Sequence, residues 1–136
     1  MTPASATVGS SPSAAVTAVA FARYADGRFG CGVIDPGHGL VVASPTRPAD
    51  AAAAAPLSAS GSYGPLLLAD PKGGLPLAVR EYLLDIRPGY SSDPVRGVYN
   101  RAWIVGDARA VTADTQASID GLLEIEPISN RPPQSP

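Results

Sequence analysis

The sequence is poor in the residues that build metal centres and disulfides. Its 136 residues include one cysteine, Cys31, and one histidine, His38. One cysteine cannot form a disulfide within the chain, and a zinc site needs about four ligands, mostly from cysteine and histidine. We therefore expect no intrachain disulfide, no bound metal and no other cofactor.

Charge is also scarce. Charged residues make up 16% of the chain, and the formal net charge is −2. A protein that holds a nucleic acid backbone needs a basic field, so we expect no nucleic acid partner. No apolar run approaches the roughly 18 residues of a membrane span, and residues 1–16 lack the basic start and unbroken apolar stretch of a signal peptide. We expect no membrane insertion.

Both ends of the chain are rich in small and polar residues. Residues 1–15 are mainly Ser, Thr, Pro, Ala and Gly without periodicity, and residues 127–136 are Pro-rich and polar. Such segments bury too little apolar surface to balance the entropy lost on ordering. We therefore predict a flexible N-terminal segment, one domain over residues 16–126 and a Pro-rich tail.

The clearest structural pattern spans residues 63–88. A short apolar run, residues 65–69, lies between turn-forming residues, which is typical of a buried strand. After a glycine-containing turn, apolar residues recur at helical spacing until Pro88 ends the pattern. A buried strand followed directly by an amphipathic helix belongs to a parallel sheet that is covered by helices.

The segments around it extend the alternation. Residues 40–43 and 101–107 are predicted strands, and residues 49–59 and 111–123 are predicted helices. From residue 40 the order is thus β-α-β-α-β-α. Because crossovers between parallel strands are right-handed, this order predicts a three-layer or open-faced α/β arrangement.

The segment before residue 40 shows another pattern. Residues 16–24 are β-prone, Asp26-Gly27 is a typical hairpin turn, and residues 29–34 can return as a second strand. We therefore predict an N-terminal β-hairpin over residues 16–34.

The predicted core consists of apolar residues from the strands and from the helices that follow them. They are Val41, Val42, Leu66, Leu67, Leu68, Val79, Leu83, Ile86, Ile104, Val105, Ile119 and Leu122. Tyr82 and Trp103 are able to stack on sugars, but their places on a helix face and in a strand predict that they belong to the core as well.

A series of short motifs follows the same order along the chain. They are Pro48 to Leu57, Gly64 to Leu68, Leu75 to Val79, Ile86 to Pro88, Ala102 to Gly106 and Val111-Thr112. Together they resemble the cell wall binding repeat 2 family, found in surface proteins of Gram-positive bacteria, over residues 40–125.

The resemblance implies a Rossmann-like or flavodoxin-like repeat that usually occurs in three copies packed side by side. It implies a secreted, non-catalytic module at the bacterial cell surface, whose partner is an anionic cell-wall polysaccharide or teichoic-type polymer. The sequence holds a single copy of the repeat. We therefore expect either a homo-oligomer, most simply a trimer, or sibling repeats in a longer parent protein.

Polar and cationic residues follow each predicted strand. In open α/β sheets, ligands bind outside the carboxyl ends of the strands, where loops meet helix N-termini. The candidate ligand-binding residues are Ser44, Arg47, Asp70, Lys72, Asp107 and Arg109. The same Ser and Asp residues are also suited to capping helices and turns, so both interpretations stay open.

No arrangement of residues predicts catalysis. His38 with Asp35 suggests a base and Ser44 a nucleophile, but residues 35–39 are first of all a turn, and no glycine-rich nucleotide-binding motif is present. We expect a binding module and no enzyme. The alternative is a structural module that assembles with its own copies into an oligomer or fibre, because the alanine-rich helix 49–59 allows close packing.

Overall fold

The described part of the chain alternates helices and strands. A computed structural model describes residues 13–27, 30–59, 64–88 and 100–124. The elements in these ranges are α2 (Ala14–Arg23), β1 (Gly39–Ala43), α3 (Pro48–Ala59), β2 (Leu66–Leu68), α4 (Leu77–Asp85), β3 (Arg101–Val105) and α5 (Ala113–Leu123). The β-α-β-α-β-α order predicted from residue 40 is confirmed. The predicted tail over residues 127–136 lies outside the described residues, as do residues 1–12.

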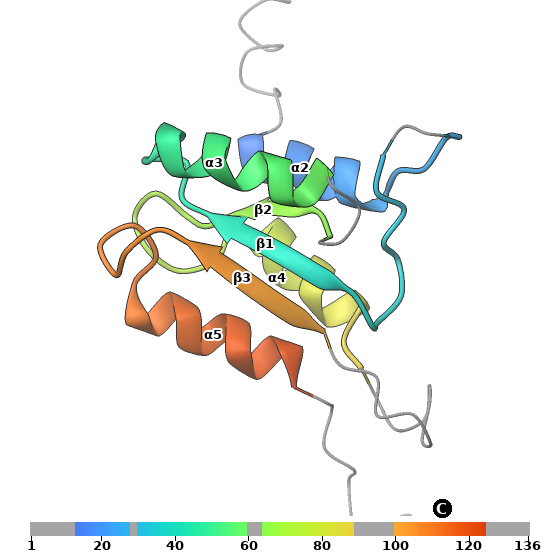
Figure 1. The fold of residues 1–136 in the computed structure, drawn as a ribbon. Coiled ribbons are helices and arrows are strands. Elements are labelled where there is room, and N and C mark those ends of the chain that lie inside the picture. Colours follow the sequence, from blue (N-terminus) through green and yellow to red (C-terminus); the bar gives the residue numbers. More distant parts are fainter. Residues whose placement is uncertain (1–12, 28–29, 60–63, 89–99, 125–136) are drawn as a thin grey trace, which may run out of the picture.

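The strands form one parallel sheet in the order β2-β1-β3. β1 is central, and its Val42 aligns with Leu67 of β2 and with Ile104 of β3. The chain leaves β1 through α3 towards one edge and then crosses through α4 to the other edge (Figure 1). This doubly wound order confirms a small α/β fold of the Rossmann-like or flavodoxin-like type. It places the topological switch point between the carboxyl ends of β1 and β3.

The helices cover the two faces of the sheet unequally. On one face, α2, α4 and α5 pack over the main core, which includes Leu40, Val42, Leu67, Val79, Leu83, Ile86 and Ile119. On the other face, α3 is the one described helix that covers a smaller cluster, built on Val41, Ala43 and Ala54 (Figure 1). In the described ranges, no helix is long and apolar enough to cross a membrane.

Most of the predicted core residues are buried. The exceptions are half-buried: Leu66, Leu68, Ile104, Val105 and Leu122. The first four lie on β2 and β3, which are the edge strands of the sheet. An edge strand has a neighbour on one side only, so its side chains keep more contact with solvent.

The predicted N-terminal hairpin over residues 16–34 is wrong. Residues 14–23 form α2, and the described residues 30–34 belong to no strand. Ser13 caps the helix, because its side chain accepts a hydrogen bond of 3.2 Å from the Val16 N–H. Alanine-rich sequence favours a helix, and Ala15, Val19 and Ala22 recur at helical spacing and are buried. Residues 13–15, predicted to be flexible, therefore belong to the start of this helix.

Tyr82 of α4 connects this helix to α2 and to the loop that follows α2. It is fully buried, and its hydroxyl donates a 2.8 Å hydrogen bond to the Val33 carbonyl. The Arg23 guanidinium lies 4.9 Å from the centre of the Tyr82 ring and pairs with Asp85 at 2.6 Å. Burial raises the pKa of Tyr82, so the phenol keeps its proton and remains a donor. The prediction that Tyr82 is a core residue is confirmed.

The prediction that Trp103 is a core residue is wrong. It aligns with Val41 and so lies on the face of the sheet that α3 covers, where it is 38% exposed. Its ring lies against β1 at Gly39, since a Cβ added at Gly39 would be 2.6 Å from Trp103 Cζ3. Trp103 stays partly exposed because it belongs to an edge strand on the face that a single helix covers.

Candidate functional site

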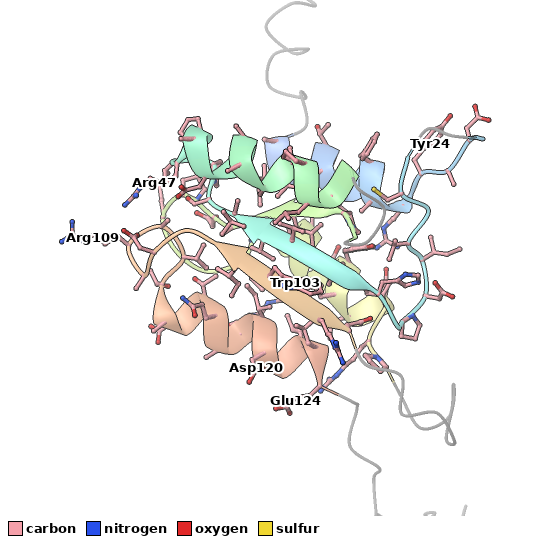
Figure 2. The ribbon with its side chains drawn as sticks, viewed as in Figure 1. Tyr24, Arg47, Trp103, Arg109, Asp120 and Glu124 are labelled. Carbon is pink, nitrogen blue, oxygen red and sulfur yellow. The ribbon has the colours of Figure 1, made fainter. Side chains whose placement is uncertain are left out.

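The predicted site residues gather at one end of the sheet. All three strands are parallel, so the loops that follow them leave from the same edge. Figure 2 shows the side chains of Arg47 and Arg109 extending outward together at this end, from the loops after β1 and β3. We call this end, with the loops of residues 44–47, 70–74 and 106–110, the carboxyl edge.

Ser44 shapes the loop after β1. It is 1% exposed, and its Oγ lies 2.8 Å from Thr46 Oγ1. The same oxygen accepts a hydrogen bond of 3.3 Å from the Thr46 N–H. The Ser44 carbonyl accepts another from the Arg47 N–H at 3.2 Å. Ser44 therefore turns the chain so that Arg47 points outward, which is the capping role left open by the sequence.

Asp70 has the same local role after β2. Its Oδ1 accepts a 2.8 Å hydrogen bond from the Lys72 N–H, and its own N–H donates to the Gly74 carbonyl at 3.0 Å. The Gly74 N–H donates to Thr115 Oγ1 at 2.8 Å, which ties this loop to α5. The Lys72 ammonium is exposed and has no partner among the described residues. The Asp70 carboxylate therefore stabilises the turn, and the Lys72 ammonium is exposed to solvent.

Asp107 organises the loop after β3. Its Oδ1 accepts hydrogen bonds from the N–H groups of Ala110 at 3.0 Å and Arg109 at 2.9 Å, and it lies 3.4 Å from Arg47 Nη2. The bonds from Ala110 and Arg109, helped by the charge of Arg47, hold the pKa of Asp107 below its ordinary value. The Arg109 guanidinium has no partner in the described part of the chain.

The carboxylates of Asp50 and Asp107 lie at the switch point between β1 and β3. Gly106 leaves β3 with φ +129°, and a Cβ there would lie 3.1 Å from Asp50 Oδ2. Asp50 belongs to the first turn of α3, where the helix dipole favours a negative charge. Asp107 thus accepts the backbone N–H groups of its own loop, and the Asp50 carboxylate lies where the dipole of α3 favours it. An anionic ligand would therefore be held at the rim, by Arg47 and Arg109.

The residues considered for catalysis are kept apart. His38 Nε2 lies 2.8 Å from Asp35 Oδ1, just before β1, whereas Ser44 follows the other end of the same strand. The base and the nucleophile are therefore not within hydrogen-bond reach. Burial raises the pKa of the Cys31 thiol, which disfavours the reactive thiolate. Among the described residues, no group of His, Cys, Asp and Glu is placed to hold a metal ion.

Sequence reasoning missed Asn100, which connects three distant segments. Asn100 is 6% exposed, and its Oδ1 accepts hydrogen bonds from the N–H groups of Gly37 at 2.8 Å and His38 at 3.2 Å. Its Nδ2 donates to the Ile86 carbonyl at 2.8 Å. Its position directly before a predicted strand was the only signal in the sequence.

Fold and site together define a small doubly wound α/β domain with cations at the rim of its switch point. Comparison of the chain with models of known protein families, with curated proteins and with solved structures found no match. The resemblance to cell wall binding repeat 2 therefore stays a prediction from the sequence.

Proposed function

We propose that the protein is a non-catalytic, extracellular module that binds an anionic cell-wall polysaccharide or teichoic-type polymer. The observation that supports this function is the outward arrangement of Arg47 and Arg109 on neighbouring loops (Figure 2). Lys72 belongs to the loop after β2, at the same edge. The Asp70 carboxylate accepts the Lys72 backbone N–H, and the Lys72 and Arg109 side chains have no partner among the described residues, whereas Arg47 lies 3.4 Å from Asp107.

Such a site binds weakly in a single copy. Three cations at a solvent-exposed rim are screened by salt, and Asp107 partly neutralises Arg47. Firm attachment then requires several linked sites, in an oligomer or in sibling repeats of a longer chain. Binding of the polymer should therefore fall steeply as ionic strength rises.

Replacing Arg47, Lys72 and Arg109 together by alanine should abolish retention of the protein on isolated Gram-positive cell walls. Exposed cations add only a few tenths of a kcal/mol to folding, so the melting temperature and circular dichroism should stay nearly unchanged. The measurement is a pull-down with cell walls at low and high salt, with the unchanged chain alongside.

A matched pair of single substitutions controls for charge. Arg109→Ala and Arg80→Ala each remove one exposed guanidinium without a partner among the described residues, but Arg80 belongs to α4, outside the carboxyl edge. Arg109→Ala should weaken retention and Arg80→Ala should not. Equal retention of the triple variant and the parent, or retention that salt does not change, would refute the polymer site at these residues.

A second candidate function, self-assembly, is favoured by the outer side of α3. Its exposed residues are small and apolar, and they include Ala52, Ala53, Ala55 and Pro56. Asp50 is the only charged residue of this helix. A smooth, uncharged helix face allows close approach of another copy, and the family resemblance implies three copies side by side.

Light scattering after size exclusion tests this candidate. We expect a trimer at high micromolar concentration, and Ala53→Glu should convert it to a monomer by placing a charge in the contact. Ala117→Glu, the same change on the exposed side of α5, should leave the trimer intact. A monomeric parent would reject self-assembly and favour sibling repeats in a longer protein.

A further inference from the structure

The turn before β1 places the only histidine of the chain beside an Asp–Pro peptide bond. Asp35 and Pro36 form this bond, and His38 Nε2 lies 2.8 Å from Asp35 Oδ1. The side chain of Asp35 is 71% exposed and that of His38 is 39% exposed. The turn precedes Gly39, the first residue of β1, so it lies at the other end of this strand from Ser44. The Asp35–His38 pair is therefore separate from the carboxyl edge and does not depend on the polymer proposal.

The chain is anchored to the domain on both sides of this bond. Before it, the Val33 carbonyl accepts a 2.8 Å hydrogen bond from the buried Tyr82 hydroxyl. After it, Asn100 Oδ1 accepts hydrogen bonds from the N–H groups of Gly37 at 2.8 Å and His38 at 3.2 Å. The bond thus lies in a short exposed span between two fixed points, and the backbone of the histidine is held in place.

An Asp–Pro bond is chemically weaker than other peptide bonds. Its nitrogen belongs to a tertiary amide and carries no hydrogen, so it leaves as a secondary amine once it has gained a proton. The aspartate side chain can close a five-membered ring on its own main-chain carbonyl carbon, and such an intramolecular attack has a high effective concentration. A neighbouring acid that delivers the proton to the leaving nitrogen accelerates the step further.

We propose that the Asp35–Pro36 bond cleaves itself, with the Asp35 carboxylate as nucleophile and the His38 imidazolium as proton donor. Asp35 Oδ2, which has no partner among the described residues, attacks the main-chain carbonyl carbon of Asp35. The bond from this carbon to the Pro36 nitrogen breaks as the nitrogen takes the proton from His38. Water then hydrolyses the cyclic anhydride, which restores the side-chain carboxylate and leaves a free α-carboxylate. The reaction occurs once per molecule, so the protein is not a turnover enzyme.

The step needs an ionised carboxyl group and a protonated imidazole together, a combination typical of about pH 5. On the elements around the turn, Arg101 of β3 and Arg23 of α2, which pairs with Asp85 of α4, keep their charges from about pH 5 to 8. Burial raises the pKa values of the Cys31 thiol and the Tyr82 phenol, so both stay neutral. Cleavage should therefore be faster at about pH 5 than at about pH 8.

A second Asp–Pro bond in the same chain is an internal control. Asp70 and Pro71 form it, and the Asp70 Oδ1 accepts the Lys72 N–H at 2.8 Å. Because the chain has a single histidine, this carboxylate has no imidazole beside it. At about pH 5 the Asp35–Pro36 bond should cleave about tenfold faster than the Asp70–Pro71 bond in the same sample.

The test incubates the full chain at about pH 5 and about pH 8 and follows the products by intact-mass spectrometry in denaturant. We expect one product that ends at Asp35 and one that begins at Pro36. Denaturant is required because α2 stays packed in the main core through Ala15, Val19 and Ala22, which holds the two products together. The rate constant should not change on dilution, since the reaction is intramolecular.

Three substitutions assign the roles. Asp35→Ala removes the nucleophile and should abolish cleavage at this bond. His38→Gln should slow it about tenfold or more at about pH 5 and remove the difference between about pH 5 and 8, whereas a merely structural role would leave that difference in place. Asp26→Ala is the matched control, an exposed aspartate of the same loop that no proline follows, and it should leave the rate unchanged. Unchanged melting temperatures would show that the variants fold.

Any of three results would overturn the proposal. The first is cleavage at Asp35–Pro36 that is no faster than at Asp70–Pro71. The second is an equal rate and pH dependence in the His38→Gln variant and the parent. The third is a rate constant that rises with protein concentration, which would assign the cleavage to a second molecule.

Discussion

Replacing Leu67 by alanine should lower the free energy of unfolding by about 2–5 kcal/mol, as truncations of buried leucines do. Leu67 is 0% exposed in β2 and belongs to the main core with Val42 and Val79. Urea denaturation followed by circular dichroism measures the change.

Leu77→Ala is the matched control for this substitution. The chemical change is identical, but Leu77 is 69% exposed at the start of α4. We expect a loss of less than about 0.5 kcal/mol for this surface position. An effect of Leu67→Ala below about 1 kcal/mol would show that the Leu67 side chain is not enclosed.

Replacing Asn100 by alanine should cost about 2–4 kcal/mol, because it leaves three backbone groups without their partner. These are the N–H groups of Gly37 and His38 and the carbonyl of Ile86. The Ile86 carbonyl is the costliest, since this bond is buried and solvent cannot easily replace it. The loss should show as a lower urea midpoint with an unchanged slope.

Gln116→Ala gives the comparison for Asn100. Gln116 also uses its amide to contact the backbone, but it makes one such bond, from Nε2 to the Val111 carbonyl at 3.0 Å. We expect about 1 kcal/mol for it. Equal losses for both variants would mean that Asn100 does not hold the three segments together.

The alternation of strands and helices after residue 40 was predictable from sequence because each element has a strong local signal. Residues 65–69 are too short and too apolar for a surface helix, and Pro56 did not prevent α3 because the alanines around it favour a helix. α2 was missed for the opposite reason. Its buried side chains, Ala15, Val19 and Ala22, are small, so their helical periodicity carries little weight against the β-prone residues between them.

In the candidate site, too, the local features were predictable from the sequence and the long-range contacts were not. Sequence reasoning placed Arg47, Lys72 and Arg109 after strand ends, and the parallel sheet brings those ends to one edge. It did not predict that Asp50 meets Gly106 at the switch point, or that Arg47 approaches Asp107 at 3.4 Å. Such contacts depend on strand order, which local patterns do not specify.

Local sequence by itself determined the elements after residue 40, the turns that use Asp70 and Asp107, and most of the buried residues, because these depend on propensity and periodicity within a few positions. Tertiary structure alone decided that β1 is central and that Trp103 lies on a half-covered edge. It also decided that residues 100–103 share a groove with Asp120, Leu123 and Glu124. The order of strands is a property of the whole packed chain, since each strand pairs through backbone groups that every residue carries alike.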